Sequence, residues 1–241
     1  MYLLRIEQYL KSLLYRFIFT VAFIYHHILT EMLKELRLLK RRLLNTKEHS
    51  PIVAANFGVK TGEGTYIGQP RRIEGQQYIS FGNNSYMGKE GWLAAYDYYP
   101  NSGQKFTPQI SIGNNVFIGS FSTITSVNKI IIEDGVETAD FLYISDHIHS
   151  ITPEEGVPVS KRRLITRGYV KIGAFTGIGI NVCILSGVTL GKYCIVGAQT
   201  VVTRSFPDYS LIMGNPAQLV KTYSPELKKW IDPAPQEKVS N

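Results

Sequence analysis

The chain has 241 residues, of which 44% are hydrophobic and 12% aromatic, and its formal net charge is +7. This composition excludes a disordered chain, and the two cysteines, Cys183 and Cys194, exclude a disulfide framework, so both are interpreted as reduced intracellular thiols. No nucleic-acid motif accompanies the positive charge. We therefore expect phosphorylated or anionic-lipid partners and no nucleic acid.

The first 44 residues differ from the rest of the chain, because they contain no glycine or proline and are rich in leucine. They are therefore predicted to be helical. Their most apolar run, residues 17–25, has less than half of the roughly 20 residues that a membrane-spanning helix needs. Two interpretations remain open for this segment: an interfacial membrane helix, or helices that pack between subunits.

From residue 61 onward, mostly aliphatic residues recur at intervals of six, without interruption from Ile172 to Val202. A small or β-branched residue stands two positions before each of them in that run. Positions i and i−2 share one face of a strand, whereas a helical period of 3.6 residues would drift away from this pattern. A hexapeptide period is typical of a parallel β-helix, in which each coil stacks its aliphatic residues on the coil below.

The predicted fold is therefore all-β, a parallel β-helix of about six coils with a short C-terminal helix. We expect an N-terminal helical segment at 1–50, the β-helix domain at 51–222, and the C-terminal helix and tail at 223–241. Longer steps between groups predict loops at 94–111 and 145–171. The predicted inward residues, in six groups of three, are Thr61, Ile67, Ile73; Phe81, Met87, Leu93; Ile112, Ile118, Ile124; Ile132, Thr138, Ile144; Ile172, Ile178, Ile184; and Leu190, Val196, Val202.

The only histidines of the β region, His147 and His149, follow the end of a coil and open the longest insertion. A lone surface histidine is usually only solvated. Here the two positions favour a functional site, because catalytic groups concentrate on loops that a rigid scaffold carries.

These histidines, the hexads before them and the segment Gly214-Asn215-Pro216-Ala217 resemble the left-handed β-helix (hexapeptide-repeat) acetyltransferases. The chain is most similar to the sugar O-acetyltransferases of bacterial surface polysaccharide synthesis. The resemblance covers about residues 55–222 and implies left-handed coils, acetyl-CoA as co-substrate and a saccharide acceptor. It also implies a cytoplasmic homotrimer with active sites between adjacent prisms. Residues 1–44 could bring this trimer to the inner face of the membrane.

In this family, a neutral histidine accepts the proton of the acceptor hydroxyl as the oxygen attacks the thioester carbonyl. The family base lies five residues after the last inward aliphatic residue of its coil, and counting from Ile144 gives His149. The resemblance thus implies that His149 is the base. His147 is then a neighbour that orients the base or touches the acceptor, and Asp146 could hold a histidine tautomer.

The coenzyme-binding positions also carry over from the resemblance. Ile180 would supply a backbone N–H near the thioester, and the backbone of Ala198 would meet the pantetheine arm. Thr203 and Arg204 match coenzyme contacts beyond the last hexads, and Lys221 matches a basic residue that meets the nucleotide phosphates.

Three alternative functions are compatible with such a fold. One is an N-acetyltransferase that acts on an amino-sugar nucleotide or an antibiotic, and another is a non-enzymatic trimeric scaffold. A γ-class carbonic anhydrase shares the fold but needs three histidines around zinc, and the β region has two. No metal is therefore expected.

Overall fold

The structure is a computed structural model that describes residues 58–233. The predicted helical segment at 1–44 and the predicted domain boundary at residue 50 lie outside the described residues. Within residues 58–233, no helix is long and apolar enough to cross a membrane.

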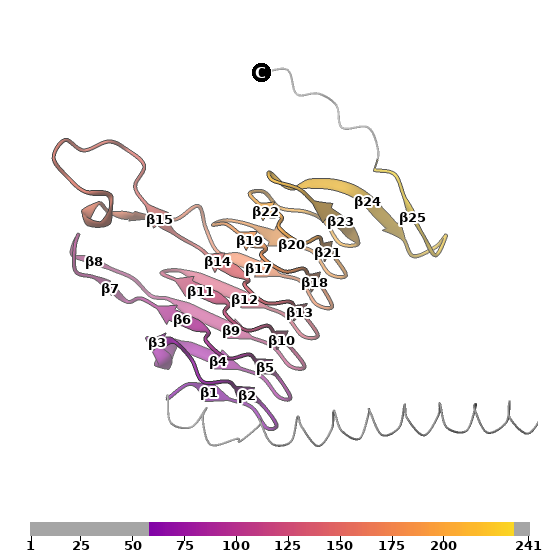
Figure 1. The fold of residues 1–241 in the computed structure, drawn as a ribbon, viewed down its shortest axis with the longest axis horizontal. Coiled ribbons are helices and arrows are strands. Elements are labelled where there is room, and N and C mark those ends of the chain that lie inside the picture. The colour runs from indigo at the N-terminus through magenta and orange to yellow at the C-terminus, as the bar shows by residue number, and fades with distance from the viewer. Residues whose placement is uncertain (1–57, 234–241) are drawn as a thin grey trace, which may run out of the picture. The chain divides into compact units, whose positions relative to one another are not determined.

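Short strands wind into three sheets that form the sides of a prism, and all their strands pair in parallel except β24 and β25 (Figure 1). The first sheet contains β1 (Lys60–Thr61), β4 (Ile79–Phe81), β9 (Gln109–Ile112), β12 (Lys129–Ile132), β17 (Val170–Ile172) and β20 (Thr189–Leu190). The second contains β2 (Tyr66–Ile67), β5 (Tyr86–Met87), β10 (Phe117–Ile118), β13 (Glu137–Thr138), β18 (Gly177–Ile178), β21 (Ile195–Val196), β23 (Ser210–Met213), β24 (Gln218–Ser224) and β25 (Lys229–Ile231). The third contains β3 (Arg72–Glu74), β6 (Trp92–Ala95), β11 (Thr123–Ser126), β14 (Tyr143–Ser145), β19 (Cys183–Ile184) and β22 (Val201–Val202).

Six coils take one strand from each sheet, and we number them from the N-terminal end. Coil 1 contains β1, β2 and β3; coil 2 contains β4, β5 and β6; coil 3 contains β9, β10 and β11. Coil 4 contains β12, β13 and β14; coil 5 contains β17, β18 and β19; coil 6 contains β20, β21 and β22. The prediction of a left-handed parallel β-helix of about six coils is thus confirmed.

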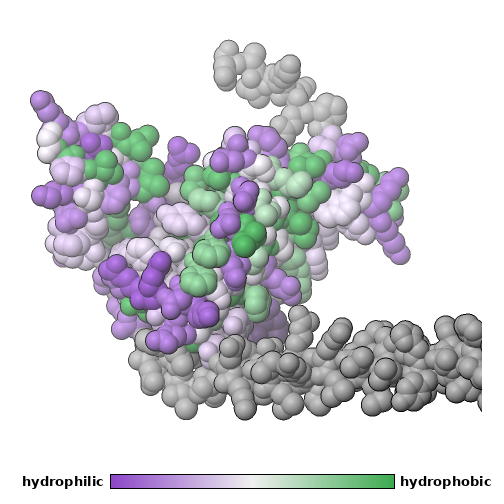
Figure 2. All heavy atoms as spheres, viewed as in Figure 1, coloured by the Kyte–Doolittle hydropathy of each residue, from purple (hydrophilic) through white to green (hydrophobic). Residues whose placement is uncertain are grey.

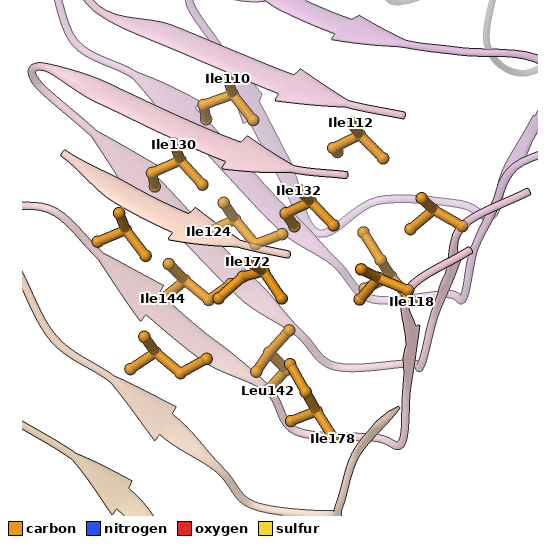
Figure 3. Close-up of a cluster of buried hydrophobic side chains, with 14 of the residues drawn as sticks. Ile110, Ile112, Ile118, Ile124, Ile130, Ile132, Leu142, Ile144, Ile172 and Ile178 are labelled. Carbon is orange, nitrogen blue, oxygen red and sulfur yellow. The ribbon is translucent and has the colours of Figure 1, made fainter. Parts of the chain in front are cut away.

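The predicted inward residues stack in register from coil to coil. In the third sheet, for example, Ile124 pairs with Ile144, which pairs with Ile184. All of the predicted inward residues are buried except Thr61 and Ile73 of coil 1, which are half-buried. Figure 3 shows these aliphatic side chains stacked inside the prism. Each fully buried aliphatic side chain contributes roughly 1.5–3 kcal/mol relative to an exposed one, so the interior is the main source of stability.

The glycines that directly follow inward residues of the hexads allow close backbone approach rather than a positive φ. A Cβ on Gly173 would lie 2.4 Å from the carbonyl carbon of Gly191, and a Cβ on Gly191 would lie 2.3 Å from the Asp208 nitrogen. The positive φ angles fall two residues later, on Phe175 and Tyr193, both at 57°. The tight corner therefore needs a missing side chain at one position and a left-handed residue at another.

A partial seventh coil follows coil 6. Phe206 bridges to Leu190, and Ile212 pairs with Val196, so both continue the inward columns. The step from Val202 to Phe206 is four residues instead of six, so the hexad period does not predict this coil.

The predicted C-terminal helix is wrong for the residues described up to 233. β24 instead pairs antiparallel with β23, and β25 pairs antiparallel with β24. β23 would otherwise leave its outer backbone groups without partners, and the β-branched and aromatic residues Val220, Thr222 and Tyr223 favour an extended partner strand.

The two predicted loops are confirmed, and each contains a short antiparallel hairpin. β7 (Tyr98–Tyr99) pairs with β8 (Gln104–Lys105), and β15 (Ile148–His149) pairs with β16 (Leu164–Ile165). Both loops leave the third sheet on the same side of the prism (Figure 1). They provide the upper wall of the cavity described next.

Candidate active site

A cavity of about 570 Å³ lies on the outer face of the third sheet, over coils 1 to 4 and beneath the two hairpins. Aromatic and histidine rings dominate its lining, and only two carboxylate or guanidinium side chains border it. The lining residues are Arg72, Glu74, Trp92, Tyr96, Tyr98, Tyr99, Pro100, Thr123, Thr125, Tyr143, Ser145, His147, Ile148, His149 and Leu164.

Hydrogen bonds join the two hairpins above the cavity. The Gln104 side chain donates from Nε2 to the Leu164 carbonyl at 3.0 Å and accepts from the Leu164 N–H at 2.7 Å. The Tyr99 hydroxyl donates to the Ser160 carbonyl, and Asn101 Nδ2 donates to the same oxygen at 2.8 Å. Because Leu164 pairs with His149 across the β15–β16 ladder, these contacts fix the backbone that carries His149.

Asp146 is fully buried behind the cavity, at the end of β14. Its carboxylate accepts hydrogen bonds from Ser126 Oγ at 2.5 Å and from the backbone N–H groups of Val127 at 2.9 Å and Asn128 at 3.0 Å. Burial alone would raise the pKa of Asp146, but the hydrogen bonds from His147 and from these three donors outweigh it and lower the pKa. The group is therefore a carboxylate at neutral pH.

His147 is held in place by this carboxylate, because its Nδ1 lies 3.0 Å from Asp146 Oδ1. A carboxylate can only accept, so Nδ1 carries the proton and Nε2 keeps the lone pair when the ring is neutral. The ring meets Tyr96 edge to face, with ring centroids 6.2 Å apart. Burial and the Glu74 carboxylate raise the pKa of Tyr96, so its hydroxyl remains protonated.

His149 lies on β15 and faces the same cavity from the hairpin. Its ring lies 5.7 Å from the ring of Tyr99, measured between centroids. Its Nδ1 is buried and has no hydrogen-bond partner among residues 58–233. The structure thus brings both predicted histidines into one cavity, and the predicted tautomer-holding residue Asp146 contacts His147.

Ser186 closes the insertion that carries both histidines. Its Oγ donates to the Asp146 carbonyl at 2.6 Å and accepts from the Arg167 N–H at 2.7 Å. Asp146 and Arg167 lie near opposite ends of this insertion. The Ser186 hydroxyl therefore holds the two ends of the insertion together. No sequence pattern indicates this role, because Ser186 lies in a later coil.

The predicted coenzyme-binding residues lie near the other end of the prism and line no part of the cavity. Ile180 and Ala198 occupy the same corner of coils 5 and 6, where the Gln199 N–H donates to the Ile180 carbonyl at 2.8 Å. Thr203 and Arg204 follow β22, and Lys221 lies on β24. All five side chains are exposed.

The N–H groups of Ile180 and Ala198 have no acceptor among the described residues. In coil 3, the N–H at the equivalent corner belongs to Ser120 and is bound by the carboxylate of Asp140 at 2.7 Å. Coil 6 offers no such side chain to Ile180, because Ala198 stands at the matching position. The corner of coils 5 and 6 therefore presents free backbone donors, which suit the polar groups of an extended ligand.

The cavity residues that were missed from the sequence include Trp92, Thr123 and Tyr143. Each directly precedes an inward aliphatic residue, so the hexad pattern already placed them on the outside of the prism. The two hairpins that turn this outer surface into a cavity have no periodic signal.

The profile of the bacterial transferase hexapeptide (six repeats) family matches residues 169–204. A probable macrolide acetyltransferase of Lysinibacillus sphaericus is 31% identical over 134 residues, which cover 51% of this chain and 71% of that protein. The chain belongs to the hexapeptide-repeat acetyltransferases.

Two further acetyltransferases are similar to this chain. The probable acetyltransferase Rv3034c of Mycobacterium tuberculosis is 29% identical over 180 residues, which cover 75% of this chain. The putative lipopolysaccharide biosynthesis O-acetyl transferase WbbJ of Escherichia coli is 31% identical over 127 residues, which cover 50% of this chain. The chain spans 55% of the length of the first of these relatives and 64% of the second.

Among solved structures, the N-acyltransferase AntD of Bacillus cereus superposes with a TM-score of 0.61 at 19% identity. The match covers 74% of this chain and 91% of AntD. At this identity, the likeness concerns the fold alone.

Proposed function

We propose that this hexapeptide-repeat acetyltransferase transfers the acetyl group of acetyl-CoA to a sugar hydroxyl in bacterial surface polysaccharide synthesis. The observation that carries the proposal is the pair of histidines, backed by a buried carboxylate, in a cavity lined with aromatic rings. Family membership and the similarity to WbbJ support the reaction and the class of acceptor.

His149 is the proposed general base. Its Nδ1 is buried, so the reacting nitrogen is Nε2. Nε2 accepts the proton of the sugar hydroxyl while the hydroxyl oxygen forms a bond to the thioester carbonyl carbon. The carbon–sulfur bond then breaks, and the departing thiolate of CoA takes the proton back from the imidazolium. The product is an O-acetyl ester and free CoA.

His147 is the proposed positioning residue, because Asp146 fixes its ring beside β15. The same pair also makes His147 a second candidate for the base, since a carboxylate at Nδ1 leaves Nε2 as the acceptor. Separate alanine variants of the two histidines distinguish these assignments.

Acetyl-CoA supplies the activated acetyl group, and the residues of coils 5 and 6 fit such a ligand. The free N–H of Ile180 is the proposed donor to the thioester oxygen, and that of Ala198 the proposed donor to the pantetheine arm. Thr203, Arg204 and Lys221 are the proposed contacts of the nucleotide end, and the two cations suit its phosphates.

A homotrimer is the proposed assembly. Figure 2 shows apolar patches on the surface of the coils. Large apolar side chains that remain exposed in the single chain include Phe121 at 41%, Phe141 at 48% and Ile180 at 42%. A neighbouring subunit would cover such surface. Light scattering that shows a fully active monomer would contradict this assembly.

Residues 1–44 are the proposed contact with the membrane or with neighbouring subunits. A chain without them should still fold and bind acetyl-CoA, because the coils begin later, but it should associate less with vesicles or form weaker oligomers. Unchanged vesicle binding and unchanged assembly would contradict both roles.

The function is tested by measuring CoA release with nucleotide sugars, lipid-linked saccharides, finished polysaccharide and a macrolide as acceptors. We expect release with saccharide acceptors and an acetylated product that mild base hydrolyses, as an ester requires. A base-resistant amide product would indicate N-acetylation, and release with the macrolide alone would replace the sugar acceptor. No release with any acceptor would contradict the activity.

A further inference from the structure

Three outward residues of the third sheet form a column with a small residue between two large aromatic ones. Thr123 pairs in register with Trp92 on coil 2 and with Tyr143 on coil 4. All three line the cavity. Parallel strands lie about 4.8 Å apart, so the two aromatic residues start roughly 10 Å apart on either side of Thr123.

This spacing leaves a slot of a defined width. A ring packed between two aromatic rings needs a contact of about 3.5–4 Å on each side, or about 7–8 Å in all. The positions of Trp92 and Tyr143 meet this requirement for one ring, provided that the residue between them is small. Threonine meets that condition, and its hydroxyl also offers a hydrogen bond to the ring's substituents.

The next column of outward residues on the same strands is made of small side chains, so it does not obstruct the slot. Thr125 pairs with Ala94 and with Ser145, and all three are small and buried. The histidines lie where coil 4 ends, close to the Tyr143 side. A ring in the slot would therefore present one edge toward His149.

Two arginines already occupy the face of the Trp92 indole that points away from Thr123. The guanidinium carbons of Arg71 and Arg72 lie 5.5 Å and 5.3 Å from the indole centroid. Both arginines belong to the start of coil 1, so they approach from the side away from Thr123. The face toward Thr123 remains for a ligand.

The charge of the cavity bears on the class of ligand. Its one guanidinium, that of Arg72, is paired with the carboxylate of Glu74. A diphosphate group in this space would lose its hydration and would find no unpaired cation among the lining residues. Its binding there would therefore be unfavourable. Aromatic rings and hydroxyl groups instead suit an uncharged ring with apolar faces and polar edges, such as a pyranose.

We propose that the slot between Trp92 and Tyr143 binds an uncharged pyranose ring of the acceptor, and not the diphosphate of a nucleotide sugar. This inference rests on the proposed function, because it places the acceptor of that reaction. It also assigns Thr123 as the residue whose small size admits the ring.

Tryptophan fluorescence tests the proposal without relying on activity. The chain has two tryptophans, so Trp230→Phe leaves Trp92 as the only one. This variant is titrated with methyl glycosides of glucose, galactose, mannose and N-acetylglucosamine, each in both anomeric forms. We expect at least one glycoside to change the emission and to saturate at about 1–20 mM, the range of a weak single-ring contact. UDP-glucose should bind no more tightly than methyl glucoside.

Two further variants in the same background locate the binding. Thr123→Leu should fill the slot and raise the dissociation constant of the glycoside at least about tenfold. Ser111→Leu is the matched control, because it places the same side chain at an outward position of coil 3 on the first sheet. Tyr143→Ala removes one wall at an exposed position and should also weaken binding, even if Thr123→Leu does not fold.

The outcomes separate this inference from the proposed function. If no glycoside changes the emission, or if Tyr143→Ala and a folded Thr123→Leu both bind like their parent, the slot is not the acceptor site, even where acetyl transfer is observed. Tighter binding of UDP-glucose than of methyl glucoside would also overturn the inference. Glycoside binding that Thr123→Leu abolishes, without acetyl transfer to any saccharide, would uphold the slot and contradict the proposed function.

Discussion

The third sheet has two parts that share an interior and differ on the outside. On coils 1 to 4, aromatic, charged and small polar side chains lie on its outer face, and two insertions rise above it. On coils 5 and 6, the strands carry Cys183 and Val201 at the outward positions, and no insertion interrupts the hexads. The inward column is isoleucine, leucine or valine throughout. Packing therefore dictates the interior, while the outward positions and corners are free to carry chemistry.

This comparison assigns different tasks to the two parts. The acceptor and the proposed base belong to coils 1 to 4, whereas the free backbone donors for acetyl-CoA belong to coils 5 and 6. Substitutions in one part should therefore change different kinetic constants from substitutions in the other.

The largest effect is expected for His149→Ala. Turnover should fall by about 10² to 10⁴, the usual contribution of a positioned general base, and acetyl-CoA affinity should stay nearly unchanged. His147→Ala should lower turnover by about tenfold, because a positioning residue supplies part of the effect. Steady-state kinetics measure both. An inactive His147 variant beside an active His149 variant would reverse the assignment, and two fully active variants would contradict the histidine mechanism.

The shared interior predicts equal losses of stability in the two parts. Ile144→Ala in coil 4 and Ile184→Ala in coil 5 should each lower the free energy of unfolding by about 2–5 kcal/mol, because both remove a fully buried side chain. Denaturant unfolding followed by circular dichroism measures this loss. A loss at Ile144 well below the loss at Ile184 would mean that the insertions loosen the interior beneath them.

The difference in stability between the parent protein and an Asp146→Asn variant should depend on pH. Its pKa is lowered in the folded protein, so the carboxylate stabilises the fold above the unfolded pKa of about 3.9, and this stabilisation is lost as pH falls through the folded pKa. Asp146→Asn should cost about 1–3 kcal/mol at pH 7 and progressively less below about pH 4. Unfolding measured from pH 3 to pH 7 checks this, with Asp140→Asn as the control at an exposed corner. A constant difference across this range would show that the charge of Asp146 has no part in the effect.

The smallest effect is expected at the exposed end of the coenzyme site. Arg204→Ala should raise the KM for acetyl-CoA by about two- to fivefold and leave kcat unchanged, because an exposed ionic contact contributes about 1 kcal/mol or less. Arg72→Ala, at the cavity, should leave this KM unchanged. If the two variants behave in the opposite way, acetyl-CoA is bound over coils 1 to 4.

The sequence predicted the interior well, because every coil must place side chains of similar size at the same spacing. The hexad spacing also predicts that Trp92, Thr123 and Tyr143 point outward. Their role in a cavity depends on the two hairpins, whose sequences show no repeat and therefore could not be predicted. The contact between Asp146 and His147 is local, whereas the tie from Ser186 joins residues far apart in sequence. The prediction of a C-terminal helix was wrong because β24 pairs with the exposed edge of β23, and local helix propensity does not reveal this edge.

Hydrogen exchange with each substrate alone tests the division between the two parts most directly. Acetyl-CoA should protect the free amides of Ile180 and Ala198 and leave the β7–β8 hairpin unchanged. A saccharide acceptor that supports transfer should protect the amides of the β7–β8 hairpin and leave coils 5 and 6 unchanged. Protection of the β7–β8 hairpin by acetyl-CoA alone, or of coils 5 and 6 by the acceptor alone, would contradict this division.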